Sequence, residues 1–143
     1  MTTPTATKPK VLFLCVHNAG RSQMALGFFR AHAGDRAIGW SAGSAPADEI
    51  SDVAVAALAE RGIDISAEVP KLRTDELQAG ADVVVTLGGG TAPELSGQRI
   101  EAWTALPDPA GWTLAGVRPL RDEIERRVLQ LLDELDLPER TTP

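Results

Sequence analysis

The sequence is poor in the residues on which several large classes of protein depend. Its 143 residues include one Cys and two His, too few for a disulfide framework or for a zinc finger of the Cys and His type. Tyr is absent, and aromatic residues make up only 4% of the chain. No apolar run approaches the ~20 residues of a membrane-spanning helix. A net charge of −6 disfavours non-specific binding to nucleic acids or anionic membranes. We therefore expect no nucleic-acid partner, no membrane partner and no bound metal.

The length fits one domain with a hydrophobic core of its own. Both ends are polar and contain Pro, which predicts a disordered leader over residues 1–8, a single domain over residues 9–137 and a flexible tail over residues 138–143. The start of the chain lacks the apolar segment of a secretory signal, and an unpaired thiol suits a reducing compartment. These features predict a cytoplasmic protein.

Apolar runs alternate with amphipathic segments along the chain. Runs rich in strand formers predict buried strands, and apolar residues three and four apart predict helices. The predicted strands cover residues 10–15, 38–44, 82–87 and 99–103, and the predicted helices cover residues 22–33, 51–61 and 117–135, with a helical turn at 74–78. This order predicts an α/β fold of three layers, with helices on both faces of a central, mainly parallel four-stranded sheet.

The predicted helix 22–33 has Ser22 where an N-cap belongs. The last predicted helix carries a run of charged residues beside its apolar face. Asp122 with Arg126, and Glu123 with Arg127, have the i,i+4 spacing of ion pairs on a helix surface. We interpret this charged run as a solvent-exposed face.

One segment places a thiol and an Arg at the two ends of a short loop. Cys15 leaves the end of a predicted strand, and Arg21 opens the next helix. Ligands of α/β sheets bind beyond the carboxyl ends of strands, and a helix N-terminus presents unpaired N–H groups with a partial positive charge. A loop that curls back there would direct its N–H groups at one point and form a nest for an anion. Gly20 and, to a lesser degree, Asn18 tolerate the left-handed backbone that such a curl needs.

The chemistry of this loop predicts an oxyanion site with a nucleophile behind it. Arg21 can bind two oxygens of a tetrahedral oxyanion with its planar fork of donors. The same positive field is expected to favour the thiolate of Cys15, and Ser22 could donate its hydroxyl to that thiolate. The candidate oxyanion-binding residues are Val16, His17, Asn18, Ala19, Gly20 and Arg21. The spacing C-x5-R alone is weak evidence, because Cys15 could be a buried small residue at a strand end.

The segment CVHNAGRSQMA resembles the signature of arsenate reductases built on the low-molecular-weight protein tyrosine phosphatase fold. Further segments are similar to that family in the same order: the turn SAG at 41–43, the strand ADVVVTL at 81–87, a Trp followed by LPDPA at 103–110, and the closing RDEIERRV. The resemblance covers nearly everything from residue 10 to residue 135. It implies the phosphatase-like three-layer fold, a monomer and no tightly bound cofactor.

The resemblance also implies roles for individual residues. Cys15 would be the nucleophile, Arg21 and the backbone of residues 16–21 would hold the oxyanion, and Asp108 would be the general acid that protonates the departing oxygen. Asp108 could alternatively be a plain turn residue between two prolines. We expect His17 to point away from the anion and to support the loop. Trp103 or Trp112 could form a wall of the pocket.

The sequence departs from the thioredoxin-coupled members of the family, which carry two more cysteines just after the third strand. Here residues 87–95 read LGGGTAPEL, which excludes an internal disulfide relay, and we interpret Gly88–Gly90 as a mobile loop. Similar single-cysteine members act as arsenate–mycothiol transferases. The resemblance therefore implies arsenate as substrate, mycothiol or another small thiol such as glutathione as cosubstrate, and a mycoredoxin or glutaredoxin-like protein as partner.

Two other functions stay open at this level. The first is a low-molecular-weight protein tyrosine phosphatase that hydrolyses phosphate monoesters through a phosphocysteine. Relatives of that kind usually have aromatic residues right after the acid loop, whereas Ala110 and Gly111 follow Pro109 here. The second is a non-enzymatic sensor of phosphate or arsenate, for which Cys15 would be dispensable.

Overall fold

The computed structural model describes residues 8–88, 98–104, 106–109, 111–135 and 137. Within these residues, four parallel strands form one sheet in the order β2-β1-β3-β4: β1 (Lys10–Cys15), β2 (Ile38–Gly43), β3 (Val83–Leu87) and β4 (Arg99–Trp103). The four predicted strands and the α/β class are confirmed. The central strand is buried from Val11 to Cys15, as expected for a parallel strand covered on both faces.

The helices are α1 (Arg21–Ala33), α2 (Asp52–Ala59), α3 (Asp75–Ala79) and α4 (Leu114–Glu134), with a short 3-10 helix at Gly34–Arg36. Helix α4 begins three residues before the predicted start, because the Thr113 side chain caps it by accepting a hydrogen bond from the Gly116 N–H. The predicted cap Ser51 of α2 is confirmed, since its side chain accepts from the Ala54 N–H.

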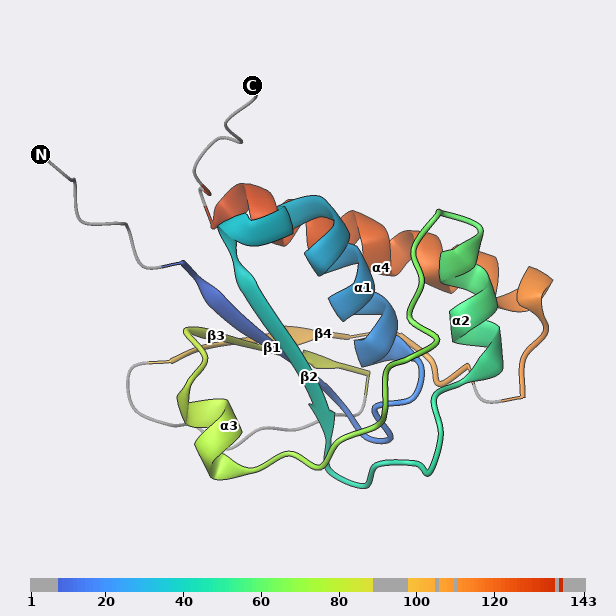
Figure 1. Ribbon diagram of the computed structural model, residues 1–143, viewed down its shortest axis with the longest axis horizontal. Helices are drawn as coiled ribbons and strands as arrows, with labels where there is room; N and C mark the ends of the chain where they lie inside the picture. The colour runs from blue at the N-terminus through green and yellow to red at the C-terminus, as the bar shows by residue number, and fades with distance from the viewer. Residues whose placement is uncertain (1–7, 89–97, 105, 110, 136, 138–143) are drawn as a thin grey trace, which may run out of the picture.

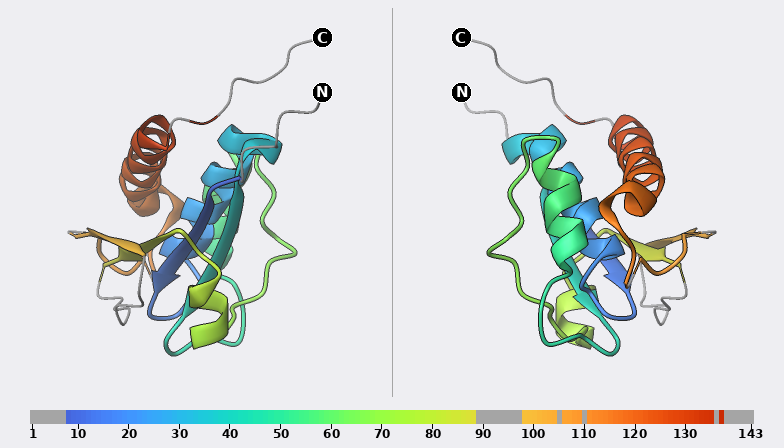
Figure 2. Two further views of the ribbon diagram at one scale, coloured as in Figure 1. Left: turned by 90° about the vertical axis from the view of Figure 1, so that its left-hand side faces the viewer. Right: turned by 90° about the vertical axis from the view of Figure 1, so that its right-hand side faces the viewer.

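The three layers are unequal. Helices α1, α2 and α4 cover one face of the sheet with the larger core, which includes Phe13, Phe28 and Phe29 (Figure 1). Figure 2 shows α4 beside α1 over that same face. The short helix α3 lies on the other face, where Leu77 packs against a small cluster around Leu12. The loop after β1 lies at the edge of the sheet where the four parallel strands end.

The prediction that Ser22 caps the first helix is wrong. Helix α1 begins at Arg21, and Gly20 stands at the cap position without a side-chain hydrogen bond. The Ser22 hydroxyl instead contacts groups of the loop that precedes the helix. Ser22 therefore contacts Cys15 and Asn18 instead of capping the helix.

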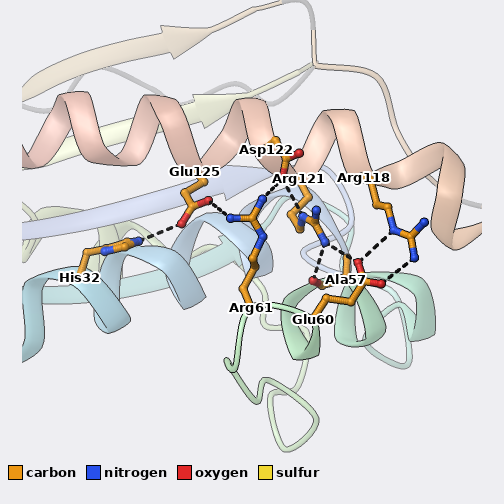
Figure 3. A network of polar contacts seen from close by, with 8 residues as sticks. All are labelled: His32, Ala57, Glu60, Arg61, Arg118, Arg121, Asp122 and Glu125. Carbon is orange, nitrogen blue, oxygen red and sulfur yellow. Dashed lines mark hydrogen bonds and ion pairs between the residues drawn. The ribbon is translucent and has the colours of Figure 1, made fainter.

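The charged run on α4 is only partly a solvent-exposed face. The ion pair Glu123–Arg127 is confirmed at 2.7 Å, but Arg126 also pairs with Glu123, and Asp122 pairs with Arg61 at 2.6 Å rather than with Arg126. The predicted i,i+4 pair between Asp122 and Arg126 is wrong, because Asp122 forms its ion pair with Arg61, which lies just after α2. Figure 3 shows the contact between Asp122 and Arg61 within a network of polar contacts that joins α4 to α1 and to the end of α2.

Arg121 anchors this network from a buried position. Its side chain is only 7% exposed and donates hydrogen bonds to the Ala57 carbonyl at 3.1 Å and to the Glu60 carboxylate at 2.6 Å (Figure 3). Hydrogen bonds from Arg118 and Arg121 lower the pKa of Glu60 to about 2. A polar seam thus joins α2 to α4 beside the apolar core.

Among the described residues, no helix is long and apolar enough to cross a membrane.

Candidate active site

The loop between β1 and α1 is held from one side by the segment that follows β2. The carbonyls of Val16, His17 and Ala19 accept hydrogen bonds from the backbone N–H groups of residues 45, 47 and 51 at 2.9–3.0 Å. Carbonyls bound in this way are turned toward residues 45–51, where they do not repel an anion. The Asn18 N–H points to Cys15 Sγ at 3.2 Å.

Asn18 fixes the curl of the loop. It is fully buried and has a φ of 50°, the left-handed conformation that Asn adopts more readily than most residues. Its side chain donates to Ser22 Oγ at 2.7 Å and accepts from the Lys71 N–H at 2.9 Å, while its carbonyl accepts from Gln23 at 3.1 Å. Sequence reasoning favoured Gly20 for the left-handed position, which is wrong: the φ of Gly20 is −124°. Asn18 takes that position because its amide is satisfied there on both sides.

The SAG turn at the end of β2 has a steric reason. A Cβ on Gly43 would lie 2.5 Å from the Val16 carbonyl oxygen and 3.0 Å from the Asn18 nitrogen. No side chain fits at such a distance, so Gly43 allows β2 to pass directly against the loop.

Cys15 Sγ lies at the bottom of the loop and is nearly inaccessible, with the residue 3% exposed. Ser22 Oγ lies 2.9 Å away, and the Asn18 N–H is a second neighbour. Because the Asn18 amide donates to Ser22 Oγ, the hydroxyl is left free to direct its own proton at the sulfur. Two donors thus converge on Sγ.

Arg21 connects the loop to the segment that carries Asp108. Its guanidinium is buried and donates from Nη1 to the Leu106 carbonyl at 2.8 Å. Leu106 precedes Asp108 by two residues, with Pro107 between them. An Arg side chain has five N–H donors, so donors remain for a ligand after this contact.

A small pocket brings most of the predicted site residues together, but Val16, Asn18 and Ser22 are not among the residues that line it. Its volume is about 120 Å³, and it is lined by Cys15, His17, Ala19, Gly20, Arg21, Ala47, Ser51, Asp108 and Pro109. Sequence reasoning missed Ala47 and Ser51, which come from the segment after β2. The one sequence feature that could have indicated these two residues is the SAG turn, because it places the segment after β2 beside the loop. Trp103 and Trp112 do not line this pocket: Trp103 packs against Phe13, and Trp112 is partly exposed.

His17 does more than support the loop. Its Nδ1 lies 3.2 Å from the Ala45 carbonyl, which agrees with the predicted supporting role. Its Nε2 lies 3.8 Å from Asp108 Oδ2, and the side chain lines the pocket, so the expectation that it points away is wrong. Within the described part of the chain, no group of three or more His, Cys, Asp or Glu side chains could hold a metal ion.

Known proteins with similar sequences and structures are arsenate reductases and phosphatases. Residues 10–140 match the family described as low molecular weight phosphotyrosine protein phosphatase. The arsenate reductase of Halalkalibacterium halodurans is 36% identical over 132 residues, which cover 85% of this chain and 93% of that protein. The glutaredoxin arsenate reductase of Synechocystis is 33% identical over 130 residues, covering 88% of this chain and 98% of that protein.

A solved structure is similar over nearly the whole chain. The thioredoxin-dependent arsenate reductase of Corynebacterium glutamicum superposes with a TM-score of 0.79 at 35% sequence identity. The match covers 92% of this chain and 63% of that one, so this chain spans less than two thirds of the larger protein.

Proposed function

The chain belongs to the low molecular weight phosphotyrosine protein phosphatase family, and from this premise we propose that it is an arsenate reductase that takes its second thiol from outside the chain. The observation that carries the proposal is that Cys15, the single cysteine of the sequence, stands in the pocket with Arg21 and Asp108. One thiol is enough to bind arsenic but not to reduce it.

The pocket suits a small tetrahedral oxyanion. Its volume of about 120 Å³ fits an inorganic oxyanion better than an extended substrate. Arg21 supplies guanidinium donors, and the backbone of residues 16–21 at the start of α1 supplies N–H groups and the positive end of a helix. Arsenate held there would have its central atom in front of Cys15 Sγ.

The first step forms a bond between sulfur and arsenic. The Cys15 thiolate attacks arsenic, one arsenic–oxygen bond breaks, and Asp108 gives its proton to the departing oxygen, which leaves as water. Arsenic stays in the +5 state. Ser22 stabilises the thiolate before the attack through the 2.9 Å contact.

The second step needs an external thiol. A small thiol attacks arsenic, the bond to Cys15 Sγ breaks, and Cys15 returns to the thiolate with arsenic still at +5 on the small thiol. A redox protein of the glutaredoxin type then attacks the sulfur of that adduct. A disulfide forms, its two electrons pass to arsenic, and arsenite leaves. Relatives described as glutaredoxin and thioredoxin-dependent arsenate reductases support a partner of this class.

We propose mycothiol as the small thiol and a mycoredoxin as the partner. The composition favours a host that makes mycothiol, since the chain is rich in Ala and has 11 Arg against 3 Lys, as in proteins of high-GC actinobacteria. Glutathione would take the same place in a host that makes it, because the chemistry needs only a thiolate that can reach the pocket.

The test compares two reactions of the same site. Purified wild type and Cys15→Ser are assayed for arsenite release from arsenate and for hydrolysis of an aryl phosphate. The proposal expects arsenite release by the wild type with a small thiol and none by the variant. Unchanged function in Cys15→Ser would contradict both enzyme functions and leave the anion sensor.

Hydrolysis of phosphate monoesters is the second candidate function. Phosphate has the shape and charge of arsenate, so the same loop, nucleophile and acid would form and hydrolyse a phosphocysteine. Among the described residues, however, none of the three Phe and three Trp lines the pocket, and the chain has no Tyr. A phosphotyrosine ring would find no aromatic wall, so we expect only weak phosphatase activity beside arsenate reduction.

A further inference from the structure

His17 and Asp108 face each other across the mouth of the pocket. The imidazole Nε2 lies 3.8 Å from Asp108 Oδ2, and both side chains are about half exposed. His17 comes from the loop after β1, and Asp108 comes from the segment after β4. The contact therefore joins the anion loop to the acid.

The Ala45 carbonyl determines which ring nitrogen of His17 carries hydrogen. A carbonyl oxygen only accepts hydrogen bonds, so Nδ1, which lies 3.2 Å from it, is the donor. In the neutral ring, Nε2 is then a lone pair that faces Asp108. The backbone of residue 45 thus sets the character of the nitrogen that faces the carboxyl group.

Nε2 and Oδ2 attract each other only when at least one of the two groups carries a proton. An imidazolium facing a carboxylate attracts it, and so does a neutral imidazole facing a carboxylic acid. A neutral imidazole facing a carboxylate brings two lone pairs together. The other charged or titratable groups that line the pocket are Cys15 and Arg21.

We propose that His17 is a positioning residue for Asp108, which holds the carboxyl group over the pocket and keeps on the pair the proton that Asp108 delivers. The inference rests on the proposed role of Asp108 as general acid. In the bond-breaking step one proton passes from Oδ2 to the departing oxygen. If this proton is initially on His17 Nε2, it passes to Asp108 Oδ2 before it reaches the departing oxygen. The pair is then one proton short and regains it from water, which reaches both half-exposed side chains.

The test uses two substitutions of His17, which distinguish the contribution of Nδ1 from that of Nε2. His17→Asn keeps a donor near the Nδ1 position for Ala45 and removes the group that faces Asp108, and His17→Ala removes both. His32→Asn is the matched control, because His32 pairs with Glu125 between α1 and α4, away from the pocket. Turnover is measured across pH 5–9 for arsenate with a small thiol and for an aryl phosphate, together with KM.

We expect both His17 variants to lose about 10-fold in kcat near neutral pH, a fraction of the 10²–10⁴ that a general acid contributes. The pH profile of kcat should differ in shape between the wild type and the His17 variants, because the side chain that they remove is itself titratable. KM and the rate of Cys15 alkylation should stay at their wild-type values. In an Asp108→Asn background, His17→Asn should have no further effect, since His17 acts through Asp108.

A loss of kcat that is the same at every pH, or that adds in full to the loss from Asp108→Asn, would overturn the inference. The aryl phosphate arm distinguishes this failure from a failure of the proposed function. Hydrolysis requires the same acid but no second thiol. A chain that hydrolyses the ester with the expected pH profile, yet never reduces arsenate, would keep the role of His17 and lose the proposed substrate.

Discussion

Ser22 Oγ lies 2.9 Å from Cys15 Sγ, although the two residues are seven positions apart in the sequence and Ser22 belongs to the first turn of α1. Asn18 Nδ2 donates to the same hydroxyl oxygen at 2.7 Å. The hydroxyl proton is therefore free for the sulfur. The contacts that hold Asn18 in place therefore also orient the Ser22 hydroxyl toward Cys15 Sγ.

Ser22→Ala should slow the alkylation of Cys15 at neutral pH by about 10–100-fold. The range corresponds to the loss of one hydrogen bond to a charged group, about 1.5–3 kcal/mol. The rate of reaction with iodoacetamide measures the effect. Ser41→Ala is the control, since Ser41 Oγ is also buried but has no hydrogen-bond partner in the described part of the chain. Equal rates for the two variants would mean that the Ser22 hydroxyl does not act on the sulfur.

Asp108→Asn should lower turnover by ~10²–10⁴-fold and leave oxyanion binding intact. Asn has the shape of Asp but has no proton to give. Turnover is measured directly, and binding is measured as the phosphate concentration that half-protects Cys15 from alkylation. An unchanged turnover would remove Asp108 from the mechanism, and lost protection would make it a structural residue.

Gly88→Ala should weaken oxyanion binding through Arg21. A Cβ at Gly88 would lie 1.9 Å from Arg21 Nη1 and 2.8 Å from the Leu106 carbonyl oxygen that this nitrogen contacts, so the guanidinium must move. Half-protection of Cys15 by phosphate should need about 10–100-fold more phosphate, the effect of losing hydrogen bonds to a charged ligand.

Gly62→Ala is the matched control for this prediction. Gly62 also has a positive φ, 74° against 64° for Gly88, but a Cβ there meets nothing within 4 Å. Gly62→Ala therefore introduces the backbone strain of a positive φ without a contact with Arg21. Protection by phosphate that changes equally in the two variants would show that strain, rather than the position of Arg21, is responsible.

Glu60→Gln should lower stability at neutral pH, with a difference from the wild type that disappears in acid. Hydrogen bonds from Arg118 and Arg121 lower the pKa of Glu60 to about 2 from an ordinary value of 4.5. A carboxylate with a depressed pKa in the folded state stabilises fully above its unfolded value, and this contribution is lost as pH falls through 4.5 toward about 2.

Thermal unfolding of the wild type and Glu60→Gln across this pH range measures the difference. Glu76→Gln is the control, because Glu76 is exposed on α3 and makes no ion pair with the described residues. A gap between wild type and Glu60→Gln that stays constant down to pH 2 would show that the network of Figure 3 does not depend on the Glu60 charge.

The strands and the anion loop could be predicted because their signals are local. An apolar run, a Cys at its end and an Arg at the next helix start are all within twelve residues, and they predict β1, the loop and α1 together. The prediction failed where contacts between residues far apart in the sequence determine the local conformation. Asn18 rather than Gly20 takes the left-handed position because Lys71, 53 residues away, satisfies its amide.

The charged helix shows the same limit. Spacing along α4 predicted the pair Glu123–Arg127, which needs only the helix itself. It could not predict that Asp122 binds Arg61, or that Arg121 is buried against the end of α2, because these contacts depend on how the two helices pack. Ala47 and Ser51 were missed in the pocket for a similar reason, since the bonds that bring them to the loop run between backbones and leave no pattern in the sequence.

The most direct test of the account is the dependence of arsenite release on an external thiol. Purified protein is given arsenate with mycothiol, mycoredoxin and their reductase, and a parallel reaction omits the small thiol. We predict arsenite only when the small thiol is present, and none with Cys15→Ser. Arsenite release that is equally fast without the small thiol, or none with any small thiol beside rapid aryl phosphate hydrolysis, would contradict it.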